Sequence, residues 1–518
     1  MIAISTRLLI FLKSLPFPLV LFFSALVGAL LPLAFAPFAI WPLAIILPAV
    51  LLVLADSNYT NKQVILIGFG FGLGCFGFGV YWIYNSLHDF GMAQPIVSGA
   101  ITVLMIFILS AFPALTLLAW KWIQRRIGRQ SIWLVPILWF TFEWFRGWGF
   151  TGMPWLSLGY ALGESPLAGF VPLIGVYGLS AISILVSVAL IQVVLYKAYR
   201  FASLVVLVFA SGYGLQHIEW TEQQSKSLDV TIVQGNIPQE MKWQSDQSEN
   251  ILNIYWDETE KYWNSDLIVW PETALPGQFE NIRHSILSFL SKEASDNDSH
   301  ILTGLLMSDK ANRKSHNSML LLGGGLDENE VIYHKRHLVL FGEYYPMRWL
   351  LDLMSHLINI PYSDLQAGPY EQPLMKVRGL SLGVSICFED VFSRDIMLSI
   401  PQANILVNAS NDAWFGDSLA AHQHLQMAQM RSLETGRAMV RSTNTGVSAF
   451  IDFKGRIIQK TEQFKTLSII ETMTGRTGIT PFYYFAKVQH WIAGLILIIL
   501  LAGWFKTRYE KTAILSLS

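Results

Sequence analysis

The sequence predicts a multi-pass α-helical membrane protein that carries one large water-facing domain of α/β or α+β type. The 518 residues are 53% apolar and 14% charged, whereas about 25% of residues are charged in an average soluble protein. Apolar segments fill residues 8–215, and residues 219–465 have the composition of a soluble domain. We therefore expect seven transmembrane helices in residues 1–218, the water-facing domain in residues 219–480, and a final helix with a basic tail in residues 481–518.

The membrane part contains eight apolar segments, each long enough or nearly long enough to cross about 30 Å of hydrocarbon. They centre near Phe23, Leu47, Gly72, Phe107, Leu138, Ile184, Leu207 and Ile496. Prolines interrupt the first apolar run, so the bounds of the first two spans stay open.

Basic residues predict the orientation of these helices. Lys and Arg occur before the first span and after the second, fourth, sixth and last, whereas the opposite short loops near Ala36 and His88 carry neither. By the positive-inside rule, both termini are cytoplasmic and the large domain is on the far side of the membrane. No small-residue cleavage site follows the first apolar run, so we expect no cleavable signal peptide.

Two charged residues lie in or beside the fifth apolar segment. Glu143 and Arg146 are three residues apart and therefore share one helical face. Charges at such a depth are costly and are usually paired or functional. The sequence leaves open whether they form an interfacial ion pair or bind a lipid headgroup.

Composition and spacing exclude several classes of function. The net charge of −1, with no basic patch that contains aromatic residues, argues against nucleic-acid binding. Cys75 lies inside an apolar span and Cys387 in the soluble part, so no disulfide framework is expected. No Cys/His cluster has the spacing of a zinc site, and we interpret His422 and His424 as surface or structural residues. We expect no metal and no cofactor.

The water-facing domain alternates strand-like and helix-like runs, which indicates a layered domain large enough to bury its own core. The expected helices are Asn250–Asn264 and Leu419–Arg441, and residues 453–456 read as a hairpin turn. The expected strands are Leu228–Gln234, Leu267–Trp270, Ile301–Leu306, Met319–Leu322, Leu380–Cys387, Ile405–Ala409, Val447–Asp452 and Ser468–Glu471.

Cys387 is the first candidate for chemistry. It ends a run in which Leu380, Leu382, Val384 and Ile386 alternate with small residues, as in a half-buried strand. The chain turns polar directly after the sulfur, which places the thiol at the mouth of a sheet. The alternative is a free cysteine that fills core space, because cysteine is among the most buried residue types.

Two other segments place polar groups in a similar way. Pro271 stops a buried strand, so that Glu272 projects from its end, and Lys335 stands in a basic cluster ahead of an apolar stretch. Taken singly, either is more often a solvated surface charge. Together they fit a thiol nucleophile, because a carboxylate can accept its proton and an ammonium can stabilise an oxyanion. The amide of Phe388, next to Cys387, is a natural second oxyanion donor.

These three segments resemble the signature segments of the nitrilase superfamily. They are Trp270–Pro276, residues 333–344 and Ile386–Glu389. Within that superfamily, the chain resembles the apolipoprotein N-acyltransferase family over nearly its whole length. Further matching segments are Val233–Pro238, Ser410–Gly416, Arg441–Gly446, Glu143–Trp148 and Thr151–Trp155.

The resemblance implies an αββα-sandwich domain on a membrane domain of eight helices. It also implies a catalytic triad of Glu272, Lys335 and Cys387. Four further residues match supporting positions of the family: Glu343, Glu389, Phe388 and Trp243. Phe388 stands where the family often has tyrosine, so this chain has no side-chain hydroxyl at that position.

The implied reaction is acyl transfer at a bacterial inner membrane, with the sandwich domain on the periplasmic side. Cys387 attacks an acyl ester of a phospholipid, and the resulting thioester acylates the N-terminal amine of a diacylglyceryl-modified apolipoprotein. We expect ping-pong kinetics and a monomer in the lipid bilayer. Since both substrates carry lipid, they must reach the site through the bilayer. We therefore interpret Met347–Ile358 as a flap that dips into the membrane interface, with a helix packed on the sandwich as the alternative.

Two other functions remain open from the sequence. The first is a membrane-anchored nitrilase-type amidohydrolase, in which water takes the acyl group. The triad does not exclude it, although eight spans rather than one anchor argue against it. The second is a transporter or scaffold with an inactive sandwich, against which stand the few intramembrane charges and the presence of Glu, Lys and Cys together.

Overall fold

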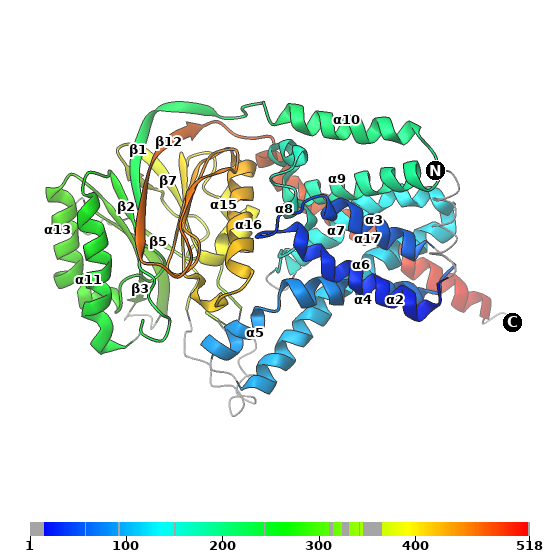
Figure 1. The fold of residues 1–518 in the computed structure, drawn as a ribbon, viewed down its shortest axis with the longest axis horizontal. Coiled ribbons are helices and arrows are strands. Elements are labelled where there is room, and N and C mark those ends of the chain that lie inside the picture. The colour runs from blue at the N-terminus through cyan, green and yellow to red at the C-terminus, as the bar shows by residue number, and fades with distance from the viewer. Residues whose placement is uncertain are drawn as a thin grey trace. The chain divides into compact units, whose positions relative to one another are not determined.

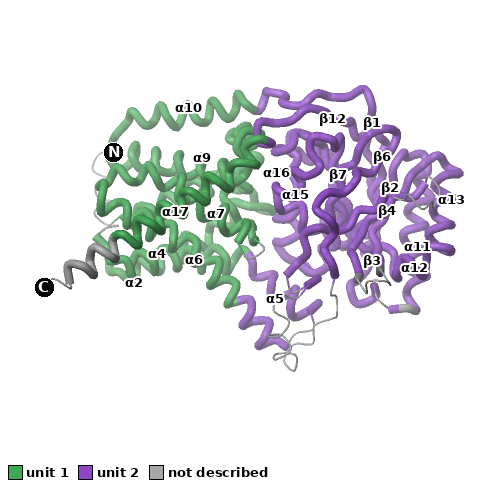
Figure 2. The backbone as a smooth tube through the Cα atoms, turned by 180° about the vertical axis from the view of Figure 1, so that it is seen from behind, with its two compact units in different colours: residues 1–79, 103–215, 484–518 green, residues 80–102, 216–483 purple. Residues whose placement is uncertain are grey.

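The computed structural model describes residues 15–515, except 57, 92–93, 150–151, 243, 310–313, 324–330, 341 and 345–364. Trp243 and the segment Met347–Ile358, for which we predicted roles, lie outside the described residues. The chain forms two compact units (Figure 2). We call residues 1–79, 103–215 and 484–518 the helical unit, and residues 80–102 and 216–483 the sandwich unit.

Each of the eight expected apolar centres lies inside a helix. These helices are α2 (Phe17–Leu30), α3 (Leu43–Ala55), α4 (Asn61–Gly79), α6 (Pro95–Ile127), α7 (Val135–Arg146), α9 (Val171–Val194), α10 (Arg200–Leu215) and α17 (Phe482–Leu515) (Figure 1). Within the described residues, five stretches are long and apolar enough to cross a membrane, and one of them, Pro95–Arg146, contains both α6 and α7. Helices α3 and α10 are apolar but shorter. The multi-pass helical fold is therefore confirmed.

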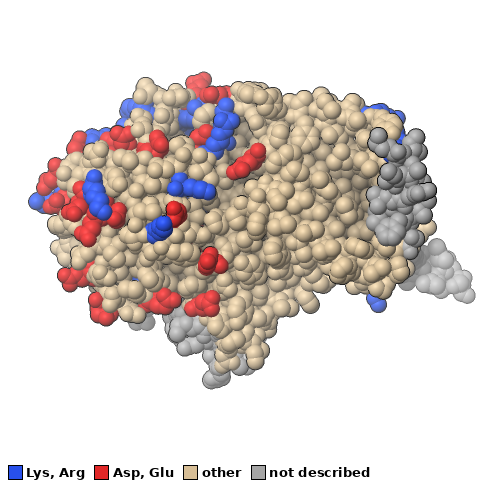
Figure 3. Space-filling model, viewed as in Figure 1, with Lys and Arg blue, Asp and Glu red and all other residues tan. Residues whose placement is uncertain are grey.

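The surface of the helical unit suits contact with lipid. Figure 3 shows few charged side chains on its visible face, whereas Lys, Arg, Asp and Glu are mixed over the sandwich unit. Large apolar side chains stand exposed on the helical unit, among them Phe22, Val206 and Trp491. A water-facing surface rarely exposes so many, and a helix that crosses hydrocarbon needs them.

Glycines allow helices α2 and α4 to pack closely. A Cβ atom added at Gly74 would lie 2.0 Å from the carbonyl oxygen of Ala25, and one at Gly28 would lie 1.9 Å from that of Phe71. The Ser24 hydroxyl also donates a hydrogen bond of 2.6 Å to the Ile67 carbonyl. Small residues and interhelical hydrogen bonds drive helix association where lipid removes the hydrophobic contribution.

A proline in α3 creates a second contact between helices. Pro48 has no N–H, so the Ala44 carbonyl one turn earlier loses its partner within the helix. The Ser183 hydroxyl of α9 donates to that carbonyl at 2.7 Å, and Ser187 donates to the Ile45 carbonyl at 2.7 Å. In hydrocarbon, an unsatisfied carbonyl costs several kcal/mol. The hydroxyl from α9 therefore supplies the hydrogen bond that α3 lacks at this position.

The described residues of the sandwich unit form two six-stranded sheets. The first has the order β12–β1–β2–β3–β4–β5 and the second β11–β10–β9–β8–β7–β6. The strands of the first sheet are β1 (Glu222–Gln234), β2 (Leu267–Val269), β3 (Ile301–Asp309), β4 (Lys314–Leu322), β5 (Ile332–His334) and β12 (Leu467–Thr477). Those of the second are β6 (Met375–Val377), β7 (Leu380–Ile386), β8 (Ile405–Ser410), β9 (Met439–Thr443), β10 (Ala449–Ile451) and β11 (Ile457–Lys460). The central strands β1–β2–β3 and β7–β8–β9 run parallel.

Helices cover the outer face of each sheet, which gives four layers (Figure 1). One apolar core lies between the sheets and joins Val230 and Val269 of the first to Val384 and Val407 of the second. A second core lies between the first sheet and α11 (Ser248–Thr259), α12 (Phe279–Ile282) and α13 (Ser288–Asp296). Helices α15 (Ser393–Met397) and α16 (Ala420–Thr435) stand on the side of the second sheet. The αββα sandwich is therefore confirmed.

One expected helix is too long. The segment Leu419–Arg441 was predicted to be helical throughout, but α16 ends at Thr435 and Met439–Arg441 belong to strand β9. Gly436 has a φ of 64°, a left-handed conformation that terminates helices and suits glycine. Strand β9 is buried between β8 and β10, so sheet pairing decides its conformation.

The segment Val80–Thr102 leaves α4 and belongs to the sandwich unit. It contains the short helix α5 (Ile83–Asn85), and the Ser86 hydroxyl beyond it donates to the Trp414 carbonyl at 2.7 Å. Trp82 and Phe415 meet edge to face, with ring centroids 4.8 Å apart. This segment therefore supports the loop that follows β8.

The glycine contact yields a test with a matched control in the same helix. Gly74→Val should destabilise the protein by about 1–3 kcal/mol or more, because the new side chain meets the backbone of α2. Gly77→Val should have little effect, because a Cβ there has no neighbour within 4 Å. Thermal unfolding in detergent, followed by size-exclusion chromatography, measures both. Equal losses for the two variants would contradict the packing described.

Candidate active site

Three strand ends bring the predicted catalytic residues to one edge of the sandwich. Glu272 follows β2 and Lys335 follows β5, both in the first sheet, whereas Cys387 follows β7 in the second. In parallel sheets, the carboxyl ends of strands share an edge and commonly carry functional groups. The two sheets therefore contribute different groups to one site.

The Lys335 ammonium lies between two carboxylates. Its Nζ is 3.3 Å from Glu272 Oε1 and 2.8 Å from Glu343 Oε1, and its side chain is only 1% exposed. Asn317 donates through Nδ2 to the same two oxygens, at 2.6 Å and 3.1 Å. The Asn411 amide donates to the other oxygen of Glu272 at 2.9 Å. These contacts leave the Glu272 carboxylate with a defined orientation.

The charges of this cluster support one another. Burial would lower the pKa of Lys335, but Glu272 and Glu343 raise it well above the ordinary lysine value. Burial opposes ionisation of Glu272, yet the pKa of that carboxyl is lowered because Lys335 and Lys242 outweigh it. Near neutral pH, Glu272 is therefore a carboxylate and Lys335 an ammonium. The first can act as a base and the second as an electrostatic stabiliser, and the two are in contact.

Cys387 stands at a strained turn beside this cluster. Its φ of 50° places a non-glycine residue in the left-handed region, which costs about 1–2 kcal/mol. Its sulfur interacts electrostatically with Glu272 and Lys335. Burial raises the pKa of the Cys387 thiol and Glu272 raises it further, whereas Lys335 lowers it. The resting thiol is therefore protonated, and it needs a base to become a nucleophile.

Glu389 holds the turn that presents Cys387. One of its carboxylate oxygens accepts from the Ile386 amide at 2.6 Å and the Tyr333 hydroxyl at 2.8 Å. The other accepts from the Arg336 amide at 2.6 Å and the His337 amide at 3.1 Å. Since these amides flank Cys387 on one side and Lys335 on the other, one buried carboxylate ties the two segments together.

Phe388 presents an aromatic ring rather than a hydroxyl. The ring meets His337 with centroids 6.0 Å apart and Phe392 with centroids 5.0 Å apart, both edge to face. Such contacts fix the ring beside the nucleophile.

A buried charge network lies behind the nucleophile. His424 is 2.8 Å from Asp390 Oδ1 and 3.0 Å from Asp412 Oδ1, and Arg441 bonds the same two carboxylates at 2.5 Å and 3.3 Å. The Ser410 hydroxyl donates to Asp412 at 2.8 Å. His424 is therefore structural, as expected. No group of described residues forms a metal site.

Three residues of the site were not predicted from the sequence: Asn317, Asn411 and Lys242. Asn317 is a buried polar residue inside the strand β4, between the apolar run Met319–Leu322 and the strand's start. A buried amide in a strand is one signal that could have identified it. Asn411 occurs in the segment Ser410–Gly416, which matched the family, but its contact with Glu272 depends on the fold.

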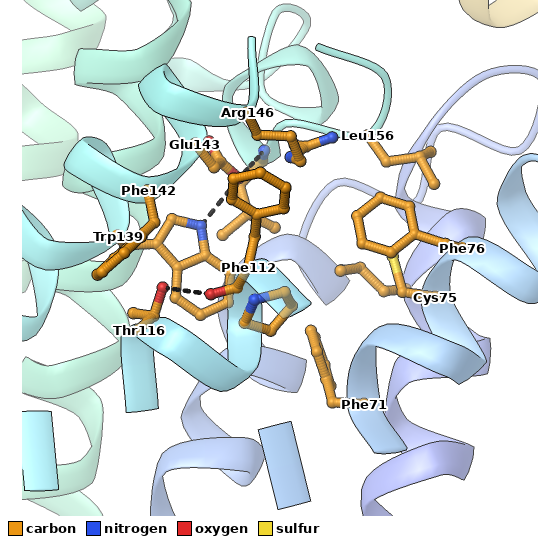
Figure 4. A pocket seen from close by; sticks show the side chains of 13 residues that line it. Phe71, Cys75, Phe76, Phe112, Thr116, Trp139, Phe142, Glu143, Arg146 and Leu156 are labelled. Atoms are coloured by element: carbon orange, nitrogen blue, oxygen red, sulfur yellow. Dashed lines mark hydrogen bonds between the residues drawn. The ribbon is translucent and has the colours of Figure 1, made fainter. Parts of the chain in front are cut away.

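Glu143 and Arg146 line a separate pocket in the helical unit (Figure 4). Arg146 donates to the Met153 carbonyl at 3.0 Å, to the Trp155 carbonyl, and to the Ser157 hydroxyl at 2.9 Å. Glu143 accepts from the Trp139 indole at 2.8 Å and the Leu158 amide at 3.0 Å. These contacts secure the connection after α7, which gives both charges a structural role.

Two family models match the chain. The model described as apolipoprotein N-acyltransferase N-terminal domain matches residues 27–189, and the carbon-nitrogen hydrolase model matches residues 229–480. A curated apolipoprotein N-acyltransferase of Nitrosomonas europaea is 39% identical over 474 residues, which cover 90% of this chain and 94% of that protein. The chain belongs to the apolipoprotein N-acyltransferase family.

Other members of the family match over similar lengths. The apolipoprotein N-acyltransferase of Coxiella burnetii is 36% identical, over 92% of this chain and 98% of its own. That of Vibrio parahaemolyticus is 34% identical, over 94% of this chain and 97% of its own. The solved structure of the C. elegans NitFhit protein aligns with 51% of this chain and 63% of its own, with a TM-score of 0.39 and 13% identity. The family resemblance predicted from the motifs is confirmed.

The histidine network generates a pH-dependent prediction. Burial and Arg441 would lower the pKa of His424, but Asp390 and Asp412 raise it above the ordinary value. A raised pKa stabilises the fold fully below about pH 6.5, and this stabilisation is lost as pH rises through the folded-state pKa. His424→Gln should therefore cost about 3 kcal/mol near pH 6, because the charge between two buried carboxylates is removed. The stability difference between His424→Gln and the parent should become smaller at higher pH.

His422→Gln is the matched control in α16. Burial lowers the pKa of His422, so the charged form of this residue does not stabilise the fold. Thermal unfolding measured from about pH 5.5 to about pH 8.5 compares the two variants. If the loss of stability in His424→Gln were the same over this whole pH range, the charge on His424 would not be what stabilises the network.

Proposed function

We propose that the protein transfers an acyl chain from a phospholipid to the α-amino group of the N-terminal S-diacylglyceryl-cysteine of apolipoproteins, and so completes lipoprotein maturation. The observation that carries this proposal is the Glu272–Lys335 pair at 3.3 Å, whose two charges shift the pKa of the Cys387 thiol in opposite directions. The names of the relatives supply the acceptor class and the N-acyl product. We propose Glu272, Lys335 and Cys387 as the catalytic residues.

In the first half-reaction, the Cys387 sulfur attacks the ester carbonyl of the donor while Glu272 accepts the thiol proton. Negative charge develops on the carbonyl oxygen, and Lys335 and the Phe388 amide stabilise it. Collapse breaks the ester C–O bond, and the proton passes from Glu272 to the leaving alkoxide. The products are a thioester on Cys387 and a lysophospholipid.

In the second half-reaction, the amine of the apolipoprotein attacks the thioester carbonyl. Glu272 accepts a proton from the nitrogen, the C–S bond breaks, and the thiolate recovers that proton. The amide product leaves with the thiol restored, so that no cofactor is consumed. Splitting one transfer into two steps predicts ping-pong kinetics.

The supporting residues act on these groups rather than on substrate. Glu343 shares the Lys335 ammonium and helps to keep it protonated, as its 2.8 Å contact allows. Glu389 holds the turn at Cys387 through the Ile386 amide. A thiol that is protonated at rest limits side reactions, and attack becomes favourable when the ester carbonyl accepts the charge.

The membrane location follows from the apolar helices and the family. We propose the bacterial inner membrane, with both termini in the cytoplasm and the sandwich unit on the periplasmic side, because basic residues mark the cytoplasmic loops. The donor and the acceptor then both reside in the same bilayer as the enzyme. We propose that the protein works as a monomer.

The first test detects the acyl-enzyme. Purified protein given a phospholipid with a labelled acyl chain, but no acceptor, should form a labelled protein adduct that hydroxylamine releases. Cys387→Ser should lower the adduct at least about 100-fold, because the nucleophile is lost. Cys75→Ser, which changes a buried cysteine of the helical unit, should leave it unchanged. An undiminished adduct in Cys387→Ser would remove Cys387 from the mechanism.

The second test separates acyl transfer from hydrolysis. With a diacylglyceryl lipopeptide as acceptor, the labelled chain should appear on the lipopeptide as an amide. An amidohydrolase would release it as free fatty acid. Mass spectrometry of both products gives their ratio, and free acid as the main product in the presence of acceptor would contradict the proposal.

A further inference from the structure

A second lysine lies buried at the site. Lys242 is 3% exposed, and its ammonium donates a hydrogen bond of 3.0 Å to the main-chain carbonyl of Glu272. Within the described part of the chain, that carbonyl is its one hydrogen-bond acceptor. The ammonium also interacts electrostatically with the Glu272 carboxylate and the Cys387 sulfur. A buried lysine without a carboxylate in direct contact is unusual, because burying the charge costs several kcal/mol.

The loop that presents Lys242 is anchored at several points. Asn444 accepts from the Ile237 amide at 2.9 Å and donates to the Ile237 carbonyl at 2.8 Å. Gln239 accepts from the Asn411 side chain at 2.8 Å. Asn411 is the residue whose amide holds Glu272. The position of Lys242 is therefore defined by the same framework that positions Glu272.

The charge balance of the site indicates why a second cation is needed. Lys335 contacts two carboxylates, Glu272 and Glu343, so these three groups together carry one negative charge. A thiolate beside a net negative charge is disfavoured. Lys242 adds a second positive charge that acts on the Glu272 carboxylate and on the Cys387 sulfur, and a buried charge acts strongly at short range.

The ammonium also bears on the backbone at Glu272. Thr273, the next residue, has a φ of 45°, so the peptide after Glu272 belongs to a strained turn. The Lys242 hydrogen bond holds the carbonyl at the start of that turn. It thereby fixes the direction in which the Glu272 side chain leaves the strand.

We propose that Lys242 is a positioning residue of the active site, which holds Glu272 through its carbonyl and supplies the positive charge that favours a thiolate at Cys387. This inference deepens the proposed function and rests on Cys387 as the nucleophile. The charged groups that act on the sulfur are Glu272, Lys335, Asp412 and Lys242, and those that act on Lys242 are Glu272 and Cys387.

Lys242 is charged at neutral pH. Burial lowers the pKa of Lys242 to about 8, although Glu272 and Cys387 act in the opposite direction. The ammonium is therefore mostly protonated below about pH 8 and loses its charge as pH rises further. Replacement by arginine, which stays charged, separates charge from the exact shape of the side chain.

The test measures the thiolate directly and does not require acyl transfer. The full chain in detergent, with Cys75→Ala so that Cys387 is the only thiol, is treated with iodoacetamide from about pH 6 to about pH 10, and the rate is followed by mass spectrometry. Lys242→Met should react about three- to tenfold more slowly near neutral pH, since one pKa unit changes the thiolate fraction tenfold. Lys242→Arg should stay within about twofold of the parent.

Two further variants keep the result interpretable. Lys242→Gln can keep the hydrogen bond without the charge, so it should follow Lys242→Met if the charge matters, and it replaces that variant if Lys242→Met does not fold. Lys261→Met changes an exposed lysine paired with Glu258 and should match the parent. The proposal is overturned if the alkylation rates of Lys242→Gln equal those of the parent at every pH. It is also overturned if Lys242→Arg is alkylated as slowly as Lys242→Gln.

This result is independent of the reaction itself. If wild-type protein formed no acyl-enzyme but Lys242→Gln shifted the alkylation profile, the proposed function would fail and the role of Lys242 at the thiol would stand. If wild-type protein formed the acyl-enzyme but Lys242→Gln left the alkylation profile unchanged, the proposed function would stand and the proposed role of Lys242 would fail.

Discussion

The buried ammonium of Lys335 between two carboxylates is the interaction on which the rest of the sandwich unit depends. A lysine that is 1% exposed costs several kcal/mol to bury unless opposite charges accompany it. Glu272 and Glu343 supply those charges at 3.3 Å and 2.8 Å. Because the three residues come from separate segments, this one contact requires the ends of β2 and β5 and the turn before Tyr344 to meet.

The rest of the site surrounds that contact with oriented donors and further charges. Asn317 and the Asn411 amide saturate Glu272, and Glu389 ties the Lys335 segment to the turn at Cys387. A left-handed cysteine persists only where its neighbours over-determine the backbone. The Ile386 amide bond to Glu389 supplies one such restraint. The Asn408 side chain, which donates to the Cys387 carbonyl at 3.2 Å, supplies another.

The helical unit solves a different physical problem, because hydrocarbon offers no water to satisfy backbone groups. Ser183 satisfies the carbonyl that Pro48 leaves open, and Gly74 lets the backbones of α2 and α4 meet. Glu143 and Arg146 follow the same logic. Glu143 accepts from the Leu158 amide and Arg146 donates to the Met153 carbonyl, so backbone groups after α7 are hydrogen-bonded beside apolar helices.

The sequence by itself determined the class of the protein and predicted Glu272, Lys335 and Cys387 as the candidate catalytic groups. Each apolar centre read from hydropathy lies inside a helix, because a bilayer requires long apolar segments. The strand ends next to Glu272 and Cys387 could be predicted because a buried strand is a local pattern, whereas the short strand before Lys335, Ile332–His334, was not predicted. Several motifs at matching spacing identified the family. The excess length of the helix predicted for Leu419–Arg441 shows the limit of local pattern, since sheet pairing overrode it.

Only the tertiary structure decided which charges meet. No periodicity in the sequence relates Asn317 to Glu272, Lys242 to the Glu272 carbonyl, or His424 to Asp390 and Asp412. The members of each pair are well separated along the chain and come from different strands, loops and helices. Electrostatic contacts depend on distance in space rather than along the chain, so the structure was needed to distinguish buried partners from ordinary surface charges.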